Sequence, residues 1–81
     1  SDKAMLHLLK TWLVAAVEFP GLCKSPLAQE SLRNAARIAW QFGFPDVTRW
    51  LNADVLDGAS PTPAAVPETR SVLRRPDVEP A

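Results

Sequence analysis

At 81 residues the chain is long enough for one small domain only, and its 47% hydrophobic content predicts a compact core. Its nine basic and nine acidic side chains cancel. Neither residues 1–58 nor residues 59–81 carry the excess of positive charge that is typical of a dedicated nucleic-acid binder. No apolar run reaches the roughly 18 residues of a membrane span, and the N-terminus lacks the pattern of a signal peptide. We therefore expect a cytoplasmic protein with no membrane contact.

Residues suited to catalysis or metal binding are scarce. Cys23 is the only cysteine and His7 the only histidine, so neither a disulfide nor a four-ligand zinc site can form. Nothing in their spacing pairs them as nucleophile and base. We interpret His7 as a solvated surface residue and Cys23 as a small buried hydrophobe. The sequence predicts no enzyme activity, no cofactor and no metal.

The first predicted helix runs from about Lys3 to Glu18, and the Pro20-Gly21 pair ends it. Its apolar side chains, Phe19 included, cover about half of the helical wheel, which is more than one neighbouring helix covers. We therefore expect this helix to be buried against two elements, one of which could belong to a second chain.

The second predicted helix has clear signals at both ends. Ser25 is a suitable N-cap, Pro26 suits the first helical position, and Gly43 can end the helix after Phe42. Its predicted core face consists of Leu27, Ala28, Leu32, Ala35, Ile38, Ala39 and Phe42.

A short third helix is predicted to begin at Pro45 or Asp46 and to end within residues 56–58. Val47, Trp50, Leu51 and Val55 form its apolar stripe. The fold class is therefore all-α: a compact three-helix module, or an intertwined helical dimer of it, followed by a proline-rich tail.

Composition changes after Gly58, because five of the eight prolines lie beyond it and no aromatic residue does. We predict a helical domain over residues 1–58 and an extended, flexible tail or linear motif over residues 59–81. Such a tail should be dispensable for folding.

Residues 38–51 resemble a helix-turn-helix motif. Ala39 lies four residues before the turn glycine, Gly43, and Val47 and Trp50 have the spacing of the two core positions of a recognition helix. The resemblance implies DNA contacts from the polar residues of that helix, which are Thr48, Arg49 and Asn52. The sequence departs from the usual pattern by about two missing residues between Gly43 and Val47, which shorten the turn and the start of the recognition helix.

Two groups of residues suit protein binding. Trp40 falls on the polar side of the second helix beside Arg33 and Arg37, and tryptophan and arginine are enriched in interface hot spots. The Arg37 guanidinium has the spacing to stack on the indole of Trp40, and Phe44 lies close by in the sequence. The second group is a dense apolar and basic stretch of the tail: Val72, Leu73, Arg74 and Arg75.

The function we expect is therefore that of a non-catalytic protein–protein interaction module, such as an adaptor, docking or regulatory domain. Its partners would be another protein and a second copy of the chain. The alternative is a small helix-turn-helix DNA-binding regulator whose C-terminal tail binds a partner, as in antitoxin-like proteins. A shift in the electrophoretic mobility of DNA that depends on salt concentration would favour the DNA-binding alternative.

Overall fold

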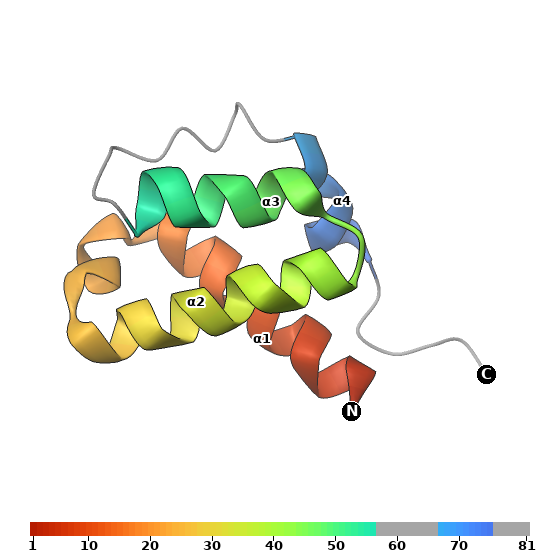
Figure 1. The fold of residues 1–81 in the computed structure, drawn as a ribbon, viewed down its shortest axis with the longest axis horizontal. Helices are drawn as coiled ribbons and strands as arrows, with labels where there is room; N and C mark the ends of the chain where they lie inside the picture. Colours follow the sequence, from red (N-terminus) through yellow and green to blue (C-terminus); the bar gives the residue numbers. More distant parts are fainter. Residues whose placement is uncertain (57–66, 76–81) are drawn as a thin grey trace.

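The computed structural model describes residues 1–56 and 67–75, and the regular structure in these ranges is helical throughout (Figure 1). The elements are α1 (Asp2–Glu18), the 3-10 turn η1 (Pro20–Lys24), α2 (Pro26–Gln41), α3 (Pro45–Trp50), the π-helical turn η2 (Leu51–Val55) and α4 (Pro67–Arg74). The three helices predicted before Gly58 are confirmed, and α4 is an addition to them.

The ends of α1 follow from its sequence. The hydroxyl of Ser1 accepts a hydrogen bond from the Ala4 N–H at 3.2 Å, which caps the first turn. Phe19 leaves the helical conformation with φ −134° and ψ 61°, although its N–H still donates to the Ala15 carbonyl. Because Pro20 follows directly, α1 cannot continue and the chain turns into η1.

The two ends of α2 are those that the sequence predicts. The Ser25 hydroxyl accepts from the Ala28 N–H at 3.2 Å, and Pro26 occupies the first turn. At the other end Gly43 adopts φ 85°, a left-handed conformation that favours glycine. The N–H groups of Gly43 and Phe44 donate to the carbonyls of Trp40 (3.1 Å) and Ala39 (2.8 Å), the pattern of a Schellman C-cap.

After this cap α3 runs back along α2 (Figure 1). The hydroxyl of Thr48 donates to the Ala36 carbonyl at 2.8 Å and so joins α3 to α2. The helix then widens into η2, in which the Leu56 N–H donates to the Leu51 carbonyl five residues back.

The core draws one or more side chains from every helix. Its largest fully buried side chains are Leu9, Leu13, Leu32, Val47, Leu51 and Val72. The wide apolar arc of α1 is covered by α2, η1 and α4, all of the same chain. Burial of α1 against more than one element is therefore confirmed, and none of this burial requires a second copy.

The prediction of an extended tail is wrong for Pro67–Arg74, which form α4 beside the start of α3 (Figure 1). Val72 is completely buried and Thr69 is 4% exposed, so α4 belongs to the core. Pro67 suits the first position of a helix as well as it suits an extended chain, and tertiary contacts select the helix. Residues 59–66 and 76–81 of the predicted tail lie outside the described residues.

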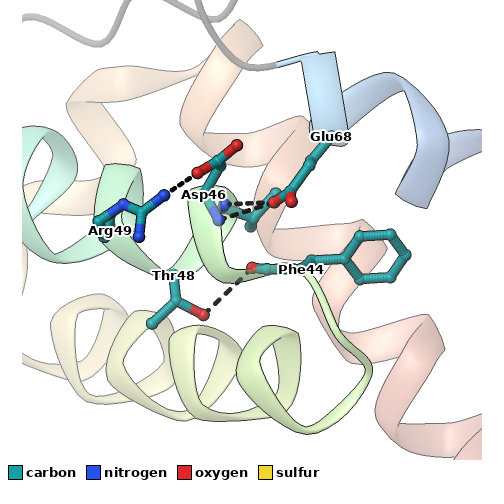
Figure 2. Close-up of polar contacts among 6 residues, drawn as sticks. Phe44, Asp46, Thr48, Arg49 and Glu68 are labelled. Atoms are coloured by element: carbon teal, nitrogen blue, oxygen red, sulfur yellow. Dashed lines mark hydrogen bonds and ion pairs between the residues drawn. The ribbon is translucent and has the colours of Figure 1, made fainter.

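Polar contacts hold α4 at both ends. The Glu68 carboxylate accepts from the N–H groups of Asp46 (2.7 Å) and Val47 (3.0 Å), which lie in the first turn of α3 (Figure 2). After the last turn of α4, the Arg75 carbonyl accepts a hydrogen bond from the Lys10 ammonium group. The Arg75 guanidinium lies 5.2 Å from the centre of the Phe42 ring. The expectation that residues 59–81 are dispensable for folding is therefore not supported for α4.

Glu68→Ala should destabilise the domain, because it leaves two N–H groups of α3 without their acceptor. Loss of a helix cap costs about 0.5–2 kcal/mol, roughly 2–16 °C in melting midpoint for a domain of this size. Thermal unfolding followed by circular dichroism measures the shift. Arg70→Ala, on the exposed side of the same helix, is the matched control and should melt with the wild type. Equal midpoints for Glu68→Ala and wild type would show that the cap contributes nothing.

Thr69→Val should act in the opposite direction. Among residues 1–56 and 67–75 the buried Thr69 hydroxyl finds no hydrogen-bonding partner, and valine has nearly the same shape and helix propensity. Removing an unpaired buried polar group should stabilise the domain by about 1 kcal/mol or more. Chemical denaturation would measure the free energy of unfolding, and a lower value for the valine variant would contradict the assignment.

Candidate functional site

The indole of Trp40 lies on the surface of α2. It is 65% exposed, and Arg33 and Arg37 are exposed on the same side of the helix. Trp50, by contrast, is 4% exposed and lies in the core. Trp12 is half-buried and packs against this core. The prediction that Trp40 lies outside the core is confirmed.

The predicted stack of Arg37 on Trp40 is replaced by a different contact. The Arg37 guanidinium donates to the Asn34 side-chain oxygen, one turn toward the start of α2. A guanidinium has five N–H donors, so this bond leaves donors that can face a partner. The exposed side of Arg33, Arg37 and Trp40, which we call the α2 surface, therefore combines positive charge with a large apolar ring.

The other predicted partner-binding residues divide between core and surface. Phe44 is half-buried against the core, and its backbone carbonyl accepts from the Thr48 hydroxyl at 3.3 Å (Figure 2). Val72 is fully buried, so it cannot reach a partner while α4 is docked. Leu73 is 40% exposed, and Arg74 and Arg75 are exposed.

Two of the three predicted DNA-reading residues make contacts within the chain. Thr48 is half-buried and bonded to the backbone of α2, as described above. Arg49 forms an ion pair with Asp46, also on the surface of α3 (Figure 2). Asn52, the third of them, is exposed.

The sequence reasoning missed an apolar corner between α1 and α2. Phe19 is 58% exposed, Leu22 62% and Leu27 77%. Leu27 was predicted to belong to the core face of α2, and this is wrong. A helical wheel gives a direction around the axis but not where the neighbouring element ends, and Leu27 lies in the first turn. Phe19 leaves the apolar side of α1 because its backbone is no longer helical.

Cys23 lies on η1 and is buried, with its thiol 4.0 Å from the Phe19 carbonyl oxygen. Burial raises the pKa of the Cys23 thiol, because the charged thiolate is poorly solvated there. His7 is exposed on α1. In residues 1–56 and 67–75, no group of three or more His, Cys, Asp or Glu side chains has the arrangement of a metal site.

The helices of the described ranges are also too short or too polar to cross a membrane. Comparison of the chain with protein-family models, with curated proteins and with solved structures finds no match.

Native Cys23 should react slowly with iodoacetamide. The thiolate is the reactive form, and both the raised pKa and the burial of the sulfur lower its availability near pH 8. Mass spectrometry should show alkylation many times slower in buffer than in denaturant, where the thiol behaves as a free cysteine. Equal rates in the two conditions would mean that η1 does not bury this side chain.

Proposed function

We propose that the chain is a non-catalytic protein–protein interaction module that binds its partner through the α2 surface. The observation that supports this proposal is the 65% exposure of Trp40 on a regular helix. An indole left in water gains hydrophobic free energy when a partner covers it, and tryptophan is the residue type most enriched in binding hot spots.

The backbone under this surface is well ordered by local contacts. Ile38 and Ala39, which flank Trp40 on the core side, are 4% and 0% exposed, and the Schellman cap ends the helix directly after it. A surface that is already ordered loses little conformational entropy on binding. Arg33 and Arg37 favour a partner with an apolar pocket bordered by carboxylates.

The C-terminal end of α4 offers a second contact. The Arg75 guanidinium lies over Phe42, the residue that ends α2, so the ends of the two helices are neighbours. Leu73, Arg74 and Arg75 are exposed there. In this proposal they act as residues of a docked helix, and not as an extended linear motif.

We favour a protein partner over DNA for two reasons. The chain has no net charge, whereas DNA binding depends on neutralising several phosphates. In addition, Thr48 and Arg49 would have to exchange their contacts within the chain for contacts with bases.

Trp40→Ala should fold and lose its partner. Removing an exposed tryptophan should cost about 1 kcal/mol of stability or less, whereas loss of a hot spot weakens binding by about 2 kcal/mol, roughly thirtyfold. Quantitative affinity capture with wild type and variant identifies the partner, and titration with the purified partner measures the loss.

Two controls make this test specific. Gln41→Ala, at the exposed neighbouring position, should bind as wild type does. Trp50→Ala removes a buried ring at a cost of about 3–5 kcal/mol and should not fold. If Trp40→Ala unfolds as Trp50→Ala does, or if it captures the same proteins as wild type, the α2 surface is not the binding site.

A further inference from the structure

Exposed apolar side chains gather where α1 passes through η1 into α2. Of the six large hydrophobic side chains that are exposed among the described residues, four lie between Val14 and Leu27. We call Phe19, Leu22 and Leu27 the corner surface. It lies at the opposite end of the molecule from α4 (Figure 1), and the proposed α2 surface does not use it.

The backbone of the corner is held in place from within. The Leu22 N–H donates to the Phe19 carbonyl at 3.0 Å, and Cys23, 4% exposed, anchors η1 to the core. Ser25 then caps α2 without an intervening loop. The three apolar side chains are therefore presented on an ordered turn, and covering them costs little ordering entropy.

The charges around the corner indicate what covers it. Glu18 precedes Phe19, Lys24 follows Leu22, and Glu30 lies one turn beyond Leu27, all of them exposed. An anionic membrane surface would favour a cluster of basic residues, which this corner lacks. Neighbouring charges of opposite sign instead suit an interface that pairs with itself, because a two-fold axis brings different residues of the same patch together.

We propose that the corner surface forms the interface of a two-fold symmetric homodimer of this chain. Phe19, Leu22 and Leu27 of the two copies pack against each other, and Lys24 of each copy faces Glu18 of the other. The net charge of zero leaves no long-range repulsion between copies. A small domain also gains stability from covering apolar surface in this way.

Such a dimer leaves the α2 surface free. Leu27 is in the first turn of α2 and Trp40 in the last, which separates them by roughly 20 Å along the axis and about 140° around it. The dimer would therefore present two α2 surfaces to a partner, and binding both at once raises the apparent affinity.

The oligomeric state of the full chain tests the proposal. Sedimentation velocity at about 10–200 µM, a range suited to a small interface, should show wild type shifting from monomer to dimer. Leu27→Asp and Leu22→Asp should each weaken dimerisation at least tenfold with unchanged helical circular dichroism. Trp40→Ala, outside the corner, should dimerise as wild type does, so this proposal and the α2 surface can fail separately.

A charge exchange tests the geometry. Lys24→Glu alone should weaken the dimer several-fold, and the double variant Glu18→Lys, Lys24→Glu should restore it, because the pair is re-formed with reversed signs. The proposal is overturned if the wild type stays monomeric at about 200 µM. It is also overturned if the double variant dimerises no more tightly than Lys24→Glu. If monomers bind phosphatidylserine vesicles and Leu27→Asp abolishes this binding, the corner surface belongs to a membrane contact. This result would also overturn the dimer proposal.

Discussion

The first turn of α3 begins without a side-chain cap of its own. Phe44 occupies the capping position, and its side chain has no oxygen that could accept a hydrogen bond. The N–H groups of Asp46 and Val47 therefore depend on another part of the chain. The Glu68 carboxylate accepts from both. This contact brings α4 against α3, and with it Val72 enters the core. The burial of the apolar sides of α1 and α3 therefore depends partly on α4. Glu68 of this helix lies more than twenty residues after the first turn of α3, which it caps.

Packing in this chain determines which residues remain for binding. The core buries Val47, Leu51 and Val72, so these side chains cannot contact a partner. The Thr48 hydroxyl joins α3 to α2 and Arg49 pairs with Asp46, so the helix that resembles a recognition helix directs its polar groups inward or along its own surface. The large apolar side chains left in water lie mainly on the α2 surface and at the corner between α1 and α2.

These two surfaces differ in character, and this difference supports separate roles for them. The α2 surface combines one aromatic ring with two cations and suits an unlike, acidic partner. The corner combines three apolar side chains with charges of both signs and suits a copy of itself. A small module with both would present two α2 surfaces to a partner from one dimer.

The sequence by itself determined the elements whose signals are local. Ser25, Pro26 and Gly43 define α2 because a cap, a fixed φ and a left-handed turn each depend on a few neighbouring residues. The exposure of Trp40 and the burial of Trp50 followed from helical periodicity. The exposed arginines of the α2 surface could be identified for the same reason.

Only the tertiary structure decided the state of α4 and of the corner. An eight-residue helix is marginal in water, and α4 buries only Thr69 and Val72, too few to produce a periodic pattern. Its helix forms because Glu68 and Val72 meet groups distant in the sequence. Leu27 and Phe19 are exposed for the converse reason: their positions on a wheel predict burial, but no neighbouring helix within residues 1–56 and 67–75 extends far enough to cover them.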